Sequence, residues 1–227
     1  MKNAILLCFL FVQFSSSGQT YKVIYEQRES INLPEELSAY KDITECKKYN
    51  VRVFEYLVDK SHSSYLFSTS YIDNRACHEA YAGTFPGAAE SYYMDFDSNL
   101  VFKNSLTLLR DDEFILFHLM DEFKILERET EIKTMLNHLC KGVTVEDKNG
   151  KKYKIWYATD IYIPGGPEKF GGLEGLIVSV DFLGGQKSII AKSITQIYEQ
   201  EITLPQFNII MTQEEFLSKM DSKFKQK

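Results

Sequence analysis

Residues 151–197 read KKYKIWYATDIYIPGGPEKFGGLEGLIVSVDFLGGQKSIIAKSITQI, and they contain the clearest indication of the fold. Residues 151–158 alternate polar and apolar side chains, which predicts a strand with one buried face. A loop rich in proline and glycine follows and interrupts the ladder, because proline lacks an N–H group. Residues 176–182 and 187–197 are rich in β-branched side chains and are joined by a Gly-Gly pair, which predicts a hairpin. The stretch therefore predicts antiparallel sheet with an irregular loop inside it.

The rest of the chain repeats this pattern of short strands and turns. Residues 33–46, opened by Pro34, predict a short helix, and residues 74–89 predict an irregular excursion. Closely spaced turns favour an antiparallel sheet that curves and could close partly into a barrel. We therefore expect one mainly β domain over residues 19–227, with further strands at 21–30, 51–58, 65–72, 92–96, 99–102, 114–120 and 124–130.

The tail of the chain predicts a helix over residues 212–225. Thr212 and Glu215 have the spacing of a capping box, in which each side chain bonds a free backbone amide at the helix start. A narrow apolar stripe follows, formed by Phe216, Met220 and Phe224. This stripe fits a helix that packs over a sheet edge, and the alternative is a docking element for a partner.

The first 18 residues have the pattern of a secretory signal peptide. Lys2 supplies the positive charge, residues 4–14 form an apolar run, and residues 15–18 are small. The run is shorter than the roughly 20 residues that a membrane-spanning helix needs. We expect a mature chain that starts near residue 19 and is secreted into the periplasm or out of the cell. No other stretch is apolar enough to span a membrane, so this chain should be soluble or peripherally attached.

Charge and aromatic content narrow the classes of partner. The formal net charge is −6, and loss of Lys2 with the leader makes it −7. A mildly acidic chain argues against nucleic acid or anionic lipid as a partner. The 14 Tyr and 16 Phe residues fit a β core or a ring-lined groove, and their spread through the strands favours the core.

Three cysteines remain once the leader, with its Cys8, is removed. An odd number in an oxidising compartment predicts one disulfide and one thiol. Cys46 and Cys77 lie in polar surroundings, so we expect them to pair, whereas Cys140 lies beside apolar residues and is expected to be a buried thiol. A Cys77–Cys140 bridge is the competing arrangement.

His138 and Cys140 are the residues that could carry chemistry. On a strand they would point the same way, as a metal site or a nucleophile and its base require. However, the sequence has no CxxC, HxxxH or HExxH pair, and no GxSxG elbow. The runs Asp111–Glu113 and Asp121–Glu122 are expected to be solvated faces. We therefore assign no catalytic, cofactor-binding or metal-binding residue and expect no cofactor; the alternative is a hydrolase or metal-binding protein that uses this pair.

The motif at residues 156–177 resembles the GLPGLI family of exported Bacteroidota proteins. The shorter block formed by residues 133–136 and by Cys140 and Lys141 is also similar to that family. One difference is Glu174, which stands where the family has proline and so removes a φ restraint and adds a charge. The matching motif residues are Trp156, Tyr157, Pro164, Gly166, Pro167, Phe170, Gly172, Leu173, Gly175, Leu176 and Ile177.

The resemblance implies an exported envelope protein rather than a particular reaction. We expect the motif to be structural, with glycines and prolines holding a corner that Trp156 and Phe170 plug. The expected function is a non-enzymatic binding or accessory component of the cell envelope. Its partners would be outer-membrane or other envelope proteins, or an apolar ligand.

Overall fold

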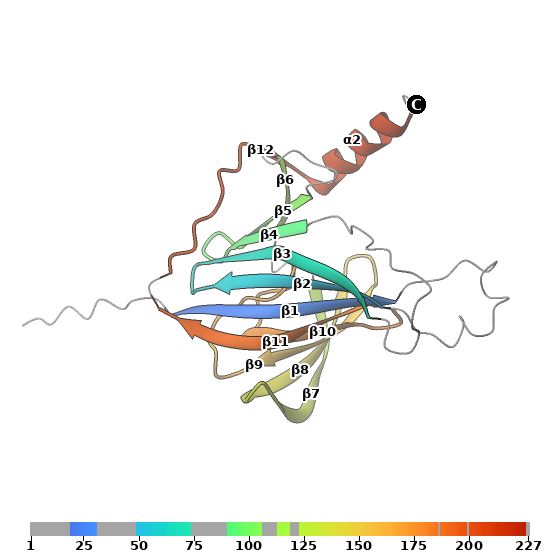
Figure 1. Ribbon diagram of the computed structural model, residues 1–227. Helices are drawn as coiled ribbons and strands as arrows, with labels where there is room; N and C mark the ends of the chain where they lie inside the picture. The colour runs from blue at the N-terminus through green and yellow to red at the C-terminus, as the bar shows by residue number, and fades with distance from the viewer. Residues whose placement is uncertain are drawn as a thin grey trace, which may run out of the picture.

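The structure, a computed structural model, describes residues 19–30, 49–73, 90–105, 113–118, 123–185, 187–198 and 200–225. Within these ranges one sheet of twelve strands carries the fold, and a short helix, α2, follows it (Figure 1). The expectation of a mainly β protein with a curved antiparallel sheet and a C-terminal helix is confirmed. The elements are β1 (Thr20–Ser30), β2 (Tyr49–Val58), β3 (His62–Asp73), β4 (Glu90–Asp95), β5 (Leu100–Ser105), β6 (Glu113–His118), β7 (Phe123–Met135), β8 (His138–Asp147), β9 (Lys152–Ala158), β10 (Leu176–Phe182), β11 (Lys187–Ile197), β12 (Ile209–Met211) and α2 (Gln213–Lys225).

The sheet is built from two meanders that meet at β1. From β1 the chain moves outward strand by strand to β6, then starts again at the far edge with β7 and returns inward to β11, which pairs with β1. All these neighbours are antiparallel, whereas β12 pairs in parallel with β6. The sheet order is β12-β6-β5-β4-β3-β2-β1-β11-β10-β9-β8-β7, so the sheet is open and β12 and β7 are its edges.

Chain connectivity requires the sheet to curl. β6 and β7 are ten strand spacings apart in the sheet order, which would be about 48 Å in a flat sheet. However, only five peptide steps separate His118 from Phe123, and they span at most about 19 Å. The end of β6 and the β8–β9 turn accordingly line one depression of about 490 Å³, together with the start of α2.

The concave face of the curled sheet holds an aromatic core. Tyr25, Tyr56 and Tyr65 are fully buried, and their ring centroids lie 5.8 to 6.1 Å apart. Phe54 stacks on Tyr65 at 4.4 Å, and Tyr92 meets the same ring edge-on. Burial of such large rings is the main stabilising contribution of this face.

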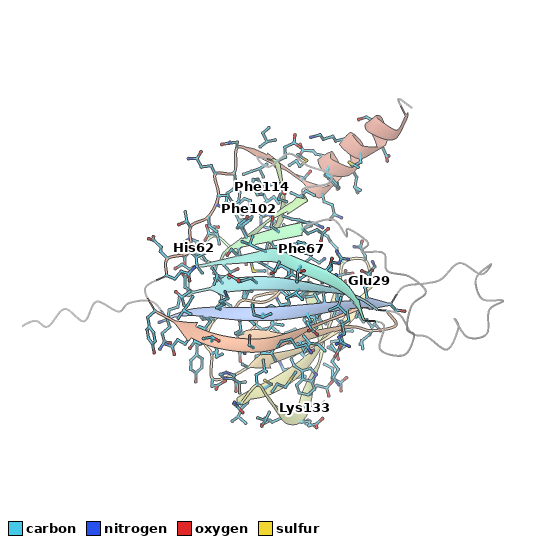
Figure 2. The ribbon with its side chains drawn as sticks, viewed as in Figure 1. Glu29, His62, Phe67, Phe102, Phe114 and Lys133 are labelled. Atoms are coloured by element: carbon cyan, nitrogen blue, oxygen red, sulfur yellow. The ribbon has the colours of Figure 1, made fainter. Side chains whose placement is uncertain are left out.

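A second, smaller aromatic group lies on the opposite face of β5 and β6. Phe207, from the segment that leads to β12, stacks on Phe102 at 3.7 Å and meets Phe114 edge-on at 4.9 Å. Figure 1 shows this segment running along the side of the sheet from β11 to β12, and Figure 2 labels the two strand rings that Phe207 contacts. These ring contacts attach the tail to the sheet.

Two details differ from the sequence expectation. The sequence pattern indicated no turn within residues 134–144, whereas the structure has a two-residue turn between β7 and β8 at Leu136 and Asn137, whose φ angles are 51° and 68°. β7 is also far longer than the predicted strand at 124–130.

The capping box at the start of α2 is confirmed: the Thr212 amide donates to Glu215 Oε2 at 2.7 Å, and the Glu215 amide donates to Thr212 Oγ1 at 3.2 Å.

Candidate functional site

The motif loop, residues 159–175, connects β9 to β10 and folds over the concave face. Two backbone bonds fix its ends to each other: the Leu176 amide donates to the Ile161 carbonyl, and the Ile177 amide donates to the Gly165 carbonyl. The loop also bonds internally, from Phe170 to Pro167 and from Gly172 to Pro164. It is therefore an ordered part of the core.

Glycine is required where this loop meets the sheet. A Cβ on Gly175 would lie 2.0 Å from the Ala158 carbonyl oxygen, and a Cβ on Gly165 would lie 2.3 Å from the Tyr56 hydroxyl. Neither distance leaves room for a side chain without a shift of the backbone or of a buried ring. The glycines of the motif thus allow the loop to reach the sheet surface.

Phe170 fills the concave side of the sheet beneath this loop, as the sequence predicted. Its ring is 1% exposed, stacks on Phe123 at 5.1 Å and meets Tyr153 and Phe182 edge-on. A narrow apolar crevice of about 70 Å³ remains beside it. That volume is well below the roughly 300 Å³ of a typical ligand pocket.

Trp156 lies on the other face of β9, which the sequence did not predict. Its neighbours Tyr153 and Ile155 face the concave side, and alternation sends Trp156 outward. It is nevertheless only 4% exposed. The ammonium groups of Lys133 and Lys154 lie 4.3 and 5.6 Å from its ring centroid, and Figure 2 labels Lys133 at this edge of the sheet.

The remaining motif residues are mostly packed, and Glu174 is not. Leu176 and Ile177 are fully buried, and the Tyr25 hydroxyl donates to the Ile177 carbonyl. Glu174 is exposed to solvent, so the charge at this position carries no burial cost. The motif residues thus build the corner between β9 and β10 and bring no pair of reactive groups together.

A cluster of polar and charged side chains lies on the concave face, toward the end of the sheet marked by Glu29 in Figure 2. Its members come from β1 to β5, from β11 and from the motif loop, and strand register places the strand members on one face. We call it the interior polar cluster, and it consists of Gln27, Glu29, Arg52, Tyr65, Glu90, Tyr92, Lys103, Glu168 and Lys187.

The three basic and three acidic side chains of this cluster form three ion pairs. Arg52 Nη2 lies 2.8 Å from Glu29 Oε2, Lys103 Nζ lies 2.7 Å from Glu90 Oε1, and Lys187 Nζ lies 2.5 Å from Glu168 Oε1. Glu168 is only 8% exposed and has a φ of 53°, which a non-glycine residue rarely adopts. Formal charges within the cluster therefore cancel.

Three polar atoms of the interior polar cluster have no hydrogen-bond partner among the residues that the structure describes. They are Gln27 Oε1, Arg52 Nε and the Tyr65 hydroxyl. Gln27 is 2% exposed, Tyr65 is fully buried, and Gln27 and Arg52 are direct partners across β1 and β2. A buried polar atom without a partner costs about 1–3 kcal/mol. Among the described residues, hydrogen-bond donors and an acceptor that lack partners therefore lie on the concave face of the sheet.

The tyrosines of the interior polar cluster stay neutral well into the alkaline range. Burial, followed by the nearby Glu168 carboxylate, raises the pKa of Tyr65 well above its ordinary value. Burial and the carboxylates of Glu168 and Glu90 do the same to the pKa of Tyr92, whose hydroxyl lies 3.1 Å from Glu90 Oε2. These phenols can act as hydrogen-bonding groups but not as anionic nucleophiles at neutral pH.

The side chains of His138 and Cys140 point the same way on β8, but the imidazole contacts Asp160, whereas the thiol bonds a backbone carbonyl. His138 Nδ1 lies 2.9 Å from Asp160 Oδ2, and Cys140 Sγ donates to the backbone carbonyl of His138 at 3.4 Å. Cys140 is fully buried, and burial raises the pKa of its thiol. An activated cysteine shows the reverse, with a lowered pKa and an accessible sulfur.

Other predicted features can be placed only in part. Cys140 is a free, buried thiol, while Cys46, Cys77, residues 1–18, the helix at 33–46 and the excursion at 74–89 lie outside the described residues. In the part of the chain that the structure covers, no group of three or more His, Cys, Asp or Glu side chains is arranged to hold a metal ion. Across the same ranges, no helix has the length and hydropathy to cross a bilayer.

The geometry defines an open, curled antiparallel sheet with a loop packed into its concave side, and solved structures share this fold. Two crystal forms of PNGF-II, in space groups C2 and P21, match 88% of this chain with TM-scores of 0.51 and 0.50 and identities of 16% and 17%. This chain spans about a third, 32% and 33%, of those longer chains. An uncharacterized conserved protein from Thermus thermophilus aligns over 86% of this chain and 90% of its own, with 5% identity and a TM-score of 0.40. No family model and no curated protein matches the sequence.

Sequence reasoning missed the interior polar cluster because its members are scattered over seven segments. The sequence contains one hint of the cluster: polar residues stand at strand positions whose side chains face the core, such as Gln27, two residues after the buried Tyr25. Recognising that signal requires the strand register. Lys187 and Glu168 also come together only through the fold of the motif loop.

Proposed function

We propose that this chain is an exported GLPGLI-type envelope protein that binds, without catalysis, a polar and uncharged ligand on its concave face. The interior polar cluster is the observation that carries the proposal. Glu168 is buried and the other charged side chains of the cluster are partly buried, and removing such groups from water costs free energy that apolar residues of similar size would not cost. A binding function accounts for that cost, because such groups orient a ligand through hydrogen bonds.

The chemistry of the cluster points to an uncharged ligand. The three ion pairs cancel their charges, so a net charge on the ligand would meet no counter-charge. Gln27 Oε1 can accept a hydrogen bond, while Arg52 Nε and the Tyr65 hydroxyl can donate one. A carboxamide or a pair of neighbouring hydroxyl groups offers the complementary donor and acceptor side by side.

The proposal is tested with Tyr65→Phe and a matched control, Tyr25→Phe. Both changes remove one hydroxyl from fully buried neighbouring rings, but the Tyr25 hydroxyl donates to the Ile177 carbonyl whereas the Tyr65 hydroxyl has no partner within the described residues. Each protein is purified from the envelope fraction of cells that express the full chain, and non-denaturing mass spectrometry looks for a bound compound.

We expect the parent and Tyr25→Phe to carry a small bound compound, and Tyr65→Phe to have lost it. Tyr25→Phe should also lose about 1 kcal/mol of stability, because it removes a satisfied hydrogen bond. If the parent carries no compound and Tyr65→Phe simply melts at a higher temperature, the cluster is a polar core and the binding proposal fails. Recovery of the intact leader in the cytosol would refute export.

The alternative function, a hydrolase or metal-binding protein that uses His138 and Cys140, is supported by one contact. The 2.9 Å approach of His138 to Asp160 is the geometry of a base oriented by a carboxylate. Elemental analysis of the purified protein, with a His138→Ala/Cys140→Ala variant as control, decides it. A stoichiometric metal that the variant lacks would favour the alternative.

A further inference from the structure

Two turns at one end of the sheet enclose a hollow of about 640 Å³. They are the β8–β9 turn and the β10–β11 turn, and they lie at the end that Glu29 marks in Figure 2, because Glu29 pairs with the first residue of β11. The volume is within the roughly 300–1,000 Å³ of small-molecule sites. We call this space the turn hollow, and its walls are formed by glycines of the two turns and by Lys151, Lys152, Tyr153, Phe182 and Leu183.

Hydrogen bonds fix the two turns of the hollow. The Leu183 amide donates to the Lys152 carbonyl at 2.9 Å and joins one turn to the other. The Asp147 carboxylate holds the β8–β9 turn, because it accepts from the Lys151 amide at 3.0 Å and from the Tyr153 hydroxyl at 2.7 Å. The turn hollow is therefore preformed, and a preformed site loses less conformational freedom on binding.

The charged side chains of the turn hollow have a single sign. Two lysines and no acidic residue line it. Lys151 and Lys152 are exposed, and neither ammonium group forms an ion pair with a residue of the described ranges. Lys187, which begins β11, differs, because it pairs with Glu168 in the interior polar cluster. On a chain of formal charge −6, two such lysines beside one hollow favour a negatively charged group there.

The remaining wall residues of the turn hollow are apolar or aromatic. Leu183 is 46% exposed in the β10–β11 turn, where small or polar residues are usual. Phe182 is partly buried and meets the Tyr153 ring edge-on at 5.0 Å. A Cβ on Gly184 would meet no atom within 4 Å, so the space beside Leu183 is open. The apolar part of a ligand can therefore leave water by contacting Phe182 and Leu183.

We propose that the turn hollow binds a small amphipathic anion, with its charged head at Lys151 and Lys152 and its apolar body against Phe182 and Leu183. Charge alone would suit inorganic phosphate, and apolar contact alone would suit a neutral alcohol. Both features in one hollow favour a ligand that combines them, such as a carboxylate on a short alkyl chain. The walls include no member of the interior polar cluster, so this site is separate from the one proposed for an uncharged ligand.

The experiment is a titration of the isotope-labelled secreted form of the chain with octanoate, followed through its amide NMR signals. The amides of Gly150, Gly184 and Gly185 are local reporters, because these glycines line the turn hollow. Octanol and inorganic phosphate are titrated in parallel, since octanol supplies only the apolar body and phosphate supplies only the charge.

Two variants separate the parts of the site. Lys151→Gln/Lys152→Gln removes both charges and keeps most of the side-chain length, and Leu183→Ser removes the exposed apolar wall. The control, Lys60→Gln/Lys141→Gln, makes the same change of formal charge at two exposed positions outside the turn hollow. Circular dichroism verifies that each variant keeps the sheet.

We expect octanoate to shift the glycine amides with a dissociation constant on the order of 1 mM. The control should bind with the affinity of the parent. The lysine variant and Leu183→Ser should each bind roughly tenfold more weakly, because each lacks one of the two kinds of contact. Sodium chloride should weaken binding to the parent, because it screens exposed charges.

Several outcomes would overturn the proposal. They are glycine amides of the parent that do not move, a lysine variant or Leu183→Ser that binds as tightly as the parent, and octanol or phosphate that binds as tightly as octanoate. Tyr65→Phe should leave octanoate binding unchanged, so this proposal and the one for the interior polar cluster can fail separately.

Discussion

At the scale of single residues, Gly175 makes the tightest contact of the motif loop. A Cβ there would lie 2.0 Å from the Ala158 carbonyl oxygen, which belongs to the backbone of β9 and cannot rotate away. Gly175→Ala should therefore force the loop off the sheet and destabilise the protein by about 1–3 kcal/mol, the usual cost of overpacking. Urea unfolding measures the change.

Glu174→Ala is the matched control for this prediction, because it changes the neighbouring residue at an exposed position. We expect its unfolding free energy to stay within about 0.5 kcal/mol of the parent value. Equal effects of the two substitutions would show that the close approach at Gly175 does not constrain the fold.

Trp156 presents a different case, since it is an outward-facing ring that the protein itself covers. Gly142 lies opposite it on β8, where a Cβ would come 2.6 Å from Glu129 Cγ and 3.1 Å from Trp156 Cη2. The missing side chain lets the β7 segment and its lysine close over the indole. Trp156→Ala should thus cost about 3–5 kcal/mol in thermal or urea unfolding, as for a core aromatic.

Lys133→Met tests how much the lysine charge beside the Trp156 ring adds to stability, apart from the packing of its aliphatic chain. It keeps most of the aliphatic cover and removes the ammonium group 4.3 Å from the ring centroid. A loss of about 0.5–1 kcal/mol is expected, the value of a partly exposed cation–π contact. For Trp156→Ala itself, a melting temperature equal to that of the parent protein would contradict the structural role and indicate that the indole binds a ligand.

At the scale of elements, α2 is attached to the sheet by few contacts. Phe216 packs on Ile115 and Met211, and Lys219 Nζ lies 2.7 Å from Glu113 Oε1. The end of the helix projects away from the sheet in Figure 1. Its stability should therefore depend more on local signals than that of any strand in the core.

Thr212→Ala tests this expectation. Loss of the cap should cost about 1 kcal/mol of helix stability, and hydrogen exchange of the amides at 215–222 should quicken several-fold. The melting temperature of the sheet should stay the same, because α2 contributes little to its core. Ser218→Ala, at an exposed mid-helix position, is the control and should slow exchange slightly. A parallel drop in the melting temperature would mean that α2 and the sheet unfold as one unit.

At the scale of the whole molecule, the buried phenols govern stability at high pH. Burial raises the pKa values of Tyr25, Tyr56, Tyr65 and Tyr92 above the ordinary value of 10.0. Below pH 10 these groups are neutral in both the folded and the unfolded chain, so they add no pH dependence. Above pH 10 the unfolded chain loses their protons first, and the folded state is progressively disfavoured.

Stability should accordingly fall above pH 10 by about 1.4 kcal/mol per pH unit for each tyrosine that stays neutral in the fold. Urea titrations between pH 9 and pH 12 measure the slope, and tyrosinate absorbance should rise together with unfolding. Tyr65→Phe should reduce the slope by one tyrosine. A flat profile, or tyrosinate absorbance that rises before unfolding, would show that the rings are accessible.

Most of the strands and the cap of the final helix could be predicted from the amino-acid sequence without the structure. Alternation in residues 151–158 and the capping pair at Thr212 and Glu215 are local signals, because they depend on neighbours within a few residues. Phe170 could be placed in the core for the same reason, as a ring in a glycine-rich loop beside apolar strands. By contrast, the Leu136–Asn137 turn was missed because leucine is a poor residue for positive φ, and only the pairing of β7 with β8 enforces it.

Only the tertiary structure decided the curl of the sheet, the covering of the outward-facing Trp156 ring and the interior polar cluster. Each depends on residues far apart in the chain: Lys187 reaches Glu168 through the motif loop, and β12 crosses to join β6. The physical reason is that strand periodicity fixes which side chains share a face. Which strands become neighbours, and therefore which faces meet, is decided by the closure of a common core.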